Sequence, residues 1–187
     1  AQGVPRLAGV PCSSARLEDG AIFRSFFTGS DGRPLGGDGT FLEIGAFDGA
    51  SESTTAFFEQ CLGWRGILVE AQPQSFRTLL RNRPFTLNIR VATCPAHGFV
   101  RFSGDAKSFS RIGGNGTDGA VGVLRTKGGT PPIHVSCGPL GDYLSLLGVT
   151  RLDYFSLDVE GSELEVIESL RTAQGLSIGV IQVEVRG

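Results

Sequence analysis

Short apolar segments alternate with helical segments over the first half of the chain, and this alternation limits the fold more than any other feature. Residues 41–44 and 66–69 have the composition of buried strands, and residues 51–62 have that of a helix between them. A helix that begins at Pro73 and a third strand at residues 87–92 continue the pattern. The order strand, helix, strand, helix, strand predicts a mostly parallel α/β sheet with helices on both faces.

The second half of the chain interrupts this order and then resumes it. Residues 98–102 (GFVRF) alternate like an edge or hairpin strand, and residues 103–130 form a glycine-rich insertion with almost no apolar period. Further segments follow: strands at 133–137, 152–157 and 178–183, and helices at 140–147 and 162–170. We therefore expect a domain at residues 39–187, preceded by an N-terminal segment, residues 1–38, that carries a helix.

Composition excludes several classes of protein. The chain has 187 residues, 40% of them apolar and 19% charged, and a net charge of -2. It therefore suits one globular domain and carries no large basic surface for nucleic acid. No apolar run is long enough to span a membrane. The absence of methionine suggests a domain excised from a longer protein, and a soluble, cytoplasmic protein is the default expectation.

The four cysteines give little information about the compartment. Cys12, Cys61, Cys94 and Cys137 show neither a CxxC pair nor a zinc-binding spacing. The default expectation is free, mostly buried thiols. A disulfide between Cys94 and Cys137 is the alternative if the protein is exported.

Four of the expected strands end in a carboxylate: Glu43, Glu70, Asp158 and Glu184. In open α/β sheets, ligands bind beyond the carboxyl ends of the strands, near the point where the strand order reverses. Carboxylates that gather at this edge of a sheet indicate a ligand site.

The turn after the first strand indicates which ligand. Residues 43–49 read EIGAFDG, so Glu43 and Asp48 flank a glycine turn that lacks the GxGxxG pattern of dinucleotide sites. Two carboxylates would repel a pyrophosphate but would attract a cofactor with an ammonium and a sulfonium group. S-adenosylmethionine is such a cofactor, and Glu70, at the end of the next strand, is placed to accept hydrogen bonds from its ribose.

Three motifs in this order, EIGAFDG, ILVEAQP and LDYFSLDVEGSELEVIESL, resemble the FkbM family of S-adenosylmethionine-dependent methyltransferases, in the branch with a GAxDG turn. The resemblance implies a Rossmann-like class I methyltransferase fold, whose seven-stranded sheet is represented here by about five main strands. The last strand pair is then missing from residues 1–187, so we expect an exposed sheet edge and either self-association as a homo-oligomer or a need for residues outside this range. Many members carry Asn where this chain has Phe47.

The resemblance also implies roles for individual residues. It assigns the following to the methionine end of the cofactor: Glu43, Gly45, Ala46, Asp48 and Gly49. It assigns Glu70 to the ribose, and Ala92 and Thr93 to the adenine edge.

The same resemblance places Asp158 next to the methyl donor and the acceptor. We expect Asp158 to be the base that activates the acceptor, with Glu160 or His134 as the next candidates. Alternatively, Asp158, Glu160 and Glu184 hold a divalent cation that lowers the pKa of the acceptor.

Three classes of function remain open from the sequence. The leading one is O-methylation of a small-molecule or sugar hydroxyl. A non-catalytic interaction module with the same fold is the alternative, and an NAD-type oxidoreductase is disfavoured because GxGxxG is missing. Basic residues in the insertion, among them Lys107 and Arg111, predict a mobile lid that suits an anionic or sugar-like acceptor.

Overall fold

The computed structural model describes residues 17–34, 37–102, 133–159 and 161–184. The glycine-rich insertion and the lid predicted for it lie outside these residues.

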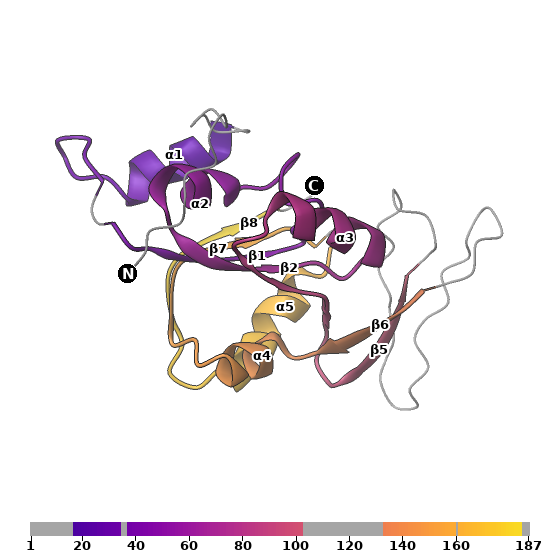
Figure 1. Cartoon of the computed structure of the whole chain (residues 1–187). Coiled ribbons are helices and arrows are strands. Elements are labelled where there is room, and N and C mark those ends of the chain that lie inside the picture. Colours follow the sequence, from indigo (N-terminus) through magenta and orange to yellow (C-terminus); the bar gives the residue numbers. More distant parts are fainter. Residues whose placement is uncertain (1–16, 35–36, 103–132, 160, 185–187) are drawn as a thin grey trace.

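A five-stranded sheet forms the centre of the fold (Figure 1). Its strands are β1 (Thr40–Ile44), β2 (Arg65–Val69), β3 (Leu87–Ile89), β7 (Arg151–Leu157) and β8 (Ser177–Val183). They lie in the order β3-β2-β1-β7-β8, and every neighbouring pair is parallel. The chain reverses its direction of travel across the sheet between β1 and β7, which is where ligands bind in folds of this kind.

One face of the sheet is covered by α1 (Leu17–Phe26), α2 (Ala56–Leu62) and α3 (Pro73–Asn82) (Figure 1). Phe41, Leu68 and Tyr154 point from the strands to this face, where they pack with Phe58 and Trp64. Trp64 is 5% exposed and is therefore a packing residue of this face.

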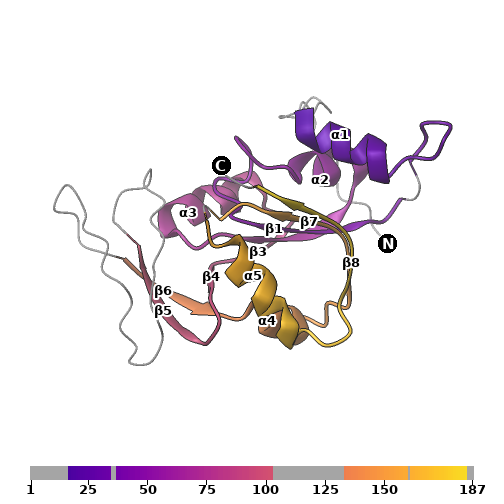
Figure 2. The same cartoon turned by 180° about the vertical axis from the view of Figure 1, so that it is seen from behind.

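The opposite face is covered by α4 (Leu140–Leu146) and α5 (Glu163–Ser169), with a short 3-10 helix, η1 (Leu170–Thr172) (Figure 2). Leu42, Val69 and Leu157 pack here against Leu144 and Val166. Helices therefore cover both faces, as the alternating sequence predicted.

A second, three-stranded sheet consists of β4 (Ala92–Thr93), β5 (Gly98–Phe102) and β6 (Ile133–Gly138), in the order β4-β6-β5. The single strand predicted at residues 87–92 is wrong, because Leu87–Ile89 pair with β2 whereas Ala92–Thr93 pair with β6. The hairpin-like character of residues 98–102 is confirmed, since β5 is antiparallel to β6.

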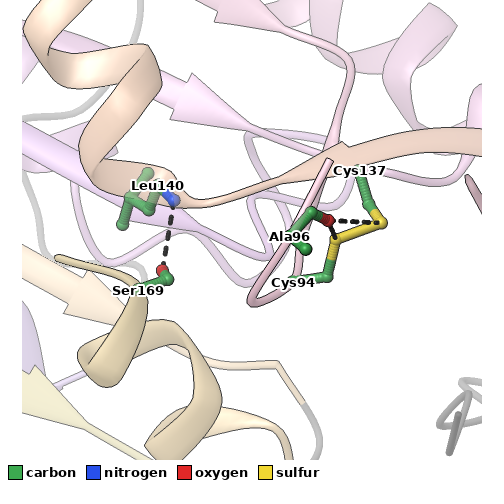
Figure 3. Close-up of a disulfide and its surroundings, with 5 residues drawn as sticks. All are labelled: Cys94, Ala96, Cys137, Leu140 and Ser169. Carbon is green, nitrogen blue, oxygen red and sulfur yellow. Dashed lines mark hydrogen bonds between the residues drawn. A yellow bond between two sulfur atoms is a disulfide. The ribbon is translucent and has the colours of Figure 1, made fainter. Parts of the chain in front are cut away.

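A disulfide joins Cys94 to Cys137 across this second sheet (Figure 3). The parallel pairing sets Ala92 opposite Cys137 and Thr93 opposite Gly138, which leaves the Cα atoms of the two cysteines 5.7 Å apart. The default expectation of free thiols is therefore wrong for this pair. Among the described residues, Cys61 is in no disulfide and is partly exposed, and Cys12 lies outside them. The alternative, a disulfide between Cys94 and Cys137, is confirmed, and the pairing of β4 with β6 brings the two half-cystines together.

The chain between β4 and β5 folds over the disulfide. The carbonyl oxygen of Ala96 lies 2.8 Å from Sγ of Cys94 and 3.9 Å from Sγ of Cys137. On the neighbouring helices, Ser169 accepts a hydrogen bond from the backbone N–H of Leu140, which ties α5 to the start of α4 (Figure 3).

Candidate functional site

A cavity opens at the carboxyl ends of β1, β7 and β8. Five of its lining residues are acidic: Glu18, Glu43, Glu52, Asp158 and Glu184. Among the described residues, no lysine, arginine or histidine lines this cavity. A cavity lined by several carboxylates favours a positively charged ligand.

The turn after β1 forms one wall of the cavity through Gly45, Ala46 and Phe47. Gly45 has a φ of +83°, and a Cβ atom added to it would lie 1.8 Å from the backbone oxygen of Asp158. The backbone N–H of Asp158 in turn donates to the carbonyl oxygen of Ile44. Gly45 is therefore needed for the close contact between the first turn and the end of β7.

Phe47 adopts a φ of +49°, in the left-handed region that side-chain-bearing residues rarely occupy. Its backbone N–H donates a hydrogen bond of 2.8 Å to a carboxylate oxygen of Glu70. The bond connects the turn after β1 to the end of β2. This contact offsets part of the conformational cost at Phe47.

Glu43 is 5% exposed, and its carboxylate holds the segment that follows the glycine turn. It accepts hydrogen bonds from the hydroxyl of Ser53 (2.7 Å), the backbone N–H of Thr54 (3.2 Å) and the hydroxyl of Thr55. Burial raises the pKa of Glu43, against the opposing effects of the Arg83 cation and these hydrogen bonds. The carboxylate predicted to bind the cofactor thus also organises its own loop.

This use of Thr55 explains why α2 begins later than expected. The sequence predicted a helix over residues 51–62, but the helix spans Ala56–Leu62. Thr55 occupies the N-cap position without a side-chain capping bond, because its hydroxyl donates to Glu43 instead. Tertiary hydrogen bonding has therefore replaced local helix formation over the first turn.

Arg83, at the C-terminal end of α3, supports the same loop and was not predicted. Its side chain is 1% exposed, forms an ion pair with Glu59, and donates to the backbone oxygen of Gly49 (3.1 Å) and the hydroxyl of Ser53 (3.0 Å). The sequence offers no signal for this role, because Arg83 follows a polar helix terminus and looks solvent-exposed. A buried cation here balances the buried carboxylates of Glu43 and Glu59.

Asp48 and Gly49 shape the turn and do not line the cavity. Partial burial raises the pKa of Asp48, but hydrogen bonds from Ser51 and Ala50 outweigh it, so the pKa is lowered overall. Gly49 has a φ of +73°, and a Cβ atom there would lie 2.4 Å from Leu79. Asp48 and Gly49 therefore stabilise the turn. The sequence alone could not distinguish this role from direct contact with a ligand.

Glu70 is 4% exposed and lies at the end of β2, outside the residues that line the cavity. Besides the bond from Phe47, it accepts one of 2.6 Å from the backbone N–H of Gln72. Burial raises the pKa of Glu70 to about 7, because the carboxylate loses hydration that these hydrogen bonds only partly replace.

A family model described as the methyltransferase FkbM domain matches residues 43–187, which is most of the chain. The chain belongs to the FkbM methyltransferase family. The resemblance seen in the three sequence motifs is thereby confirmed, and the parallel sheet agrees with the Rossmann-like fold it implied. No curated protein and no solved structure matches the chain significantly.

The far wall of this FkbM domain's cavity lies at the ends of β7 and β8, where Asp158, Gln182 and Glu184 line it. Asp158 thus lies beside the glycine turn, and its place next to a methyl donor and acceptor stays a prediction. Ser156 also lines the cavity and accepts a hydrogen bond of 2.6 Å from Thr54, which closes the floor between β7 and the loop after β1.

The other predicted residues lie elsewhere. Glu160 lies outside the described residues. Ala92 and Thr93 are in the second sheet, and His134 is exposed on β6; none of the three lines the cavity. Within the described ranges, no group of three acidic, cysteine or histidine side chains could hold a metal ion, so the expected divalent cation gains no support.

Two further acids of the cavity escaped prediction. Glu18 lies on α1, in the segment before the family match, and Glu52 lies in the polar loop that was taken for the start of a helix. Neither residue follows a strand, so the expectation that ligand-binding acids lie at strand ends did not identify them.

Within the ranges that the structure describes, no helix has the length and apolar character needed to cross a bilayer.

Proposed function

We propose that this FkbM domain binds S-adenosylmethionine and transfers its methyl group to a hydroxyl of a small molecule or sugar. One observation carries the proposal: the cavity beyond the carboxyl ends of β1, β7 and β8 is lined by carboxylates and by no basic residue of the described chain. Its charge and position suit a cofactor with a cationic methionine end.

The residues that line the cavity fit the methionine end of this cofactor. Gly45 and Ala46 bring main chain to the cavity without bulky side chains, while Glu43 and Asp158 offer negative charge near it. Glu70 would hold the ribose, because a carboxylate that already accepts two N–H donors still has lone pairs for hydroxyl groups. Ala92 and Thr93 remain the predicted contacts of the adenine.

When bound, S-adenosylmethionine supplies an electrophilic methyl group on a sulfonium that leaves as the neutral thioether S-adenosylhomocysteine. The contribution of the protein is to hold the acceptor hydroxyl in line and to take its proton. We assign the proton to Asp158, because it lines the cavity beside the glycine turn. Correct placement alone supplies about 7–11 kcal/mol in favourable cases, so a single base and a shaped cavity suffice.

Calorimetric titration with S-adenosylmethionine, S-adenosylhomocysteine and NAD tests this proposal. We expect both methionine-derived ligands to bind and NAD to give no heat of binding. Binding of NAD alone would indicate an oxidoreductase. Failure of all three ligands to bind would leave a methyltransferase-like interaction module, and the proposed activity would be withdrawn.

We also propose that two copies associate through β8. This strand lies at the edge of the sheet as far as the described residues extend, and its sequence, SIGVIQV, contains neither charge nor proline. Edges of this kind pair readily with another strand. Sedimentation analysis of the wild type and of Ile181→Lys tests the idea; a wild-type chain that stays monomeric at high concentration would refute it.

A further inference from the structure

The cavity contains one amide side chain, that of Gln182 on β8. The parallel register sets Gln182 opposite Ser156 of β7, and both residues line the cavity. Among the lining residues that the structure describes, Gln182 alone has a side chain with N–H groups, and the other polar side chains are carboxylates and hydroxyls. The sequence did not single out this residue, because it lies within an apolar strand and not at the strand end.

Two neighbours fix the direction of this amide. The hydroxyl of Tyr154, which is completely buried, donates to the amide oxygen of Gln182. The Nε2 group donates to a carboxylate oxygen of Glu18 at 3.4 Å. An amide turned the other way would place its oxygen against the Glu18 carboxylate, and two acceptors do not bond to each other. The oxygen of the amide is therefore held toward Tyr154, and its N–H groups lie on the side of Glu18, which also lines the cavity.

The hydroxyl of Tyr154 is not needed for packing. The ring packs in the aromatic cluster on this face, 4.8 Å from that of Phe58, where a phenylalanine would fill the same space. A hydroxyl placed in such a cluster costs free energy unless it is hydrogen-bonded. Burial raises the pKa of Tyr154 to about 12, so the hydroxyl keeps its proton at neutral pH and remains a donor. Its bond to Gln182 therefore positions the amide.

Other N–H groups around the cavity already have partners. The backbone N–H groups of five lining residues donate to Glu70 or to carbonyl oxygens at the ends of β1, β2 and β7: Gly45, Ala46, Phe47, Asp158 and Glu184. An amide NH2 group has two N–H bonds, and Glu18 is its one acceptor among the described residues. The second N–H of Gln182 is thus available to a ligand. An anionic group that leaves water needs a donor of this kind.

We propose that Gln182 donates an N–H to the α-carboxylate of S-adenosylmethionine, and that Tyr154 holds the amide in the direction this bond requires. The proposal rests on the methyltransferase function proposed above. It adds a cofactor contact on β8, beyond the residues that the family resemblance assigned. The amide meets the one negative group of the methionine end, so the site distinguishes an amino acid from a simple amine.

The test compares S-adenosylhomocysteine with its decarboxylated analogue, which keeps the adenosine, the thioether and the amine. Calorimetric titration measures the affinity of each variant for both ligands. Gln182→Met keeps the length of the side chain but removes the amide, so affinity for S-adenosylhomocysteine should fall about 10- to 100-fold, with a change below about threefold for the analogue. Tyr154→Phe should cause a loss of about three- to tenfold, again for S-adenosylhomocysteine alone. Gln174→Met, at an exposed position outside the cavity, should change neither affinity.

A general disturbance of the site would weaken both ligands equally, and that result would overturn the proposal. Unchanged affinities in Gln182→Met would overturn it as well. Tyr154→Phe keeps the aromatic cluster filled, so the presence or absence of a selective loss in this variant decides the question if Gln182→Met does not fold. Failure of S-adenosylhomocysteine to bind the wild type would refute the proposed function together with this contact. Normal binding to the wild type without a selective loss in the variants would refute only the role of Gln182.

Discussion

The acids of the two halves of the site differ in what surrounds them. In the glycine-turn region, which comprises residues 43–55 and Glu70, the carboxylates of Glu43, Asp48 and Glu70 each accept at least two hydrogen bonds from neighbouring chain. At the β7–β8 end, Asp158 and Glu184 line the cavity together with Glu18 from α1. Acids that looked equivalent in the sequence therefore differ: Asp48 and Glu70 hold the turn outside the cavity lining, whereas Asp158 and Glu184 line the cavity, and Glu43 does both.

The hydrogen bonds to Glu43 and Asp48 arise from the path of the chain after β1. After β1, residues 50–55 fold back over the strand end, and their hydroxyl and N–H groups approach Glu43 and Asp48. A carboxylate satisfied in this way stabilises a loop, so substituting it changes folding stability in addition to any contact with a ligand. We therefore expect substitutions in the glycine-turn region to change folding stability, and substitutions at the β7–β8 end to change turnover.

The largest expected effect is at the β7–β8 end. Asp158→Asn keeps the shape of the side chain but removes its charge, so turnover should fall about 10²- to 10⁴-fold if Asp158 accepts the proton of the acceptor. Transfer of a labelled methyl group at saturating S-adenosylmethionine measures this. Asp31→Asn, at an exposed position outside the cavity, is the control. A variant with normal turnover and weakened cofactor binding would move Asp158 into the class of cofactor ligands.

Arg83 provides the corresponding test of the glycine-turn region. Arg83→Leu leaves Glu59 and Glu43 buried without their cation, so the free energy of unfolding should fall by about 3–5 kcal/mol. Arg151→Leu is the matched control: Arg151 pairs with Asp153 at 2.6 Å, but its side chain is 69% exposed, and the loss should stay below about 1 kcal/mol. Urea denaturation of both variants measures the difference. Similar losses would show that burial of the ion pair is unimportant here.

Glu70 gives the glycine-turn region a dependence on pH. Its pKa is raised by burial to about 7 in the folded chain, so between pH 4.5 and 7 the folded state binds more protons than the unfolded state. The stabilising contribution of protonated Glu70 is present below about pH 4.5 and is lost as the pH rises to about 7, with a total loss of up to about 3 kcal/mol. Urea denaturation at pH 5 and pH 8 measures the change. The pKa of Glu43 is raised as well, so the wild type is compared with Glu70→Gln at both pH values. Between pH 5 and pH 8, the free energy of unfolding should fall less for Glu70→Gln than for the wild type. Equal falls would refute the assignment to Glu70.

The smallest effect concerns the backbone of the turn. Asn tolerates a positive φ better than Phe, so Phe47→Asn should raise the free energy of unfolding by about 0.5–1 kcal/mol. Phe85→Asn, an exposed position whose φ is not positive, should give no such gain. Thermal denaturation compares the two. A destabilised Phe47→Asn variant would mean that the phenyl ring contributes more through contacts in the cavity than the backbone loses.

Much of the fold and part of the site could be predicted because the relevant signals are local. Apolar strands, helices between them and an acid at each strand end are all readable over a few residues. The carboxyl ends of parallel strands share one edge of a sheet, so the positions of Glu43, Glu70, Asp158 and Glu184 at that edge follow from the pattern. The GAxDG turn and its two companion motifs also sufficed to indicate the family.

The sequence alone thus determined most of the order of strands and helices, the family, and the glycine turn after β1. The tertiary structure decided which groups meet across long separations: the disulfide between Cys94 and Cys137, the burial of Arg83, and the entry of Glu18 into the cavity. The physical reason is that these contacts depend on strand register and helix packing. Local periodicity predicts that an element exists, but it does not state which distant side chains that element will meet.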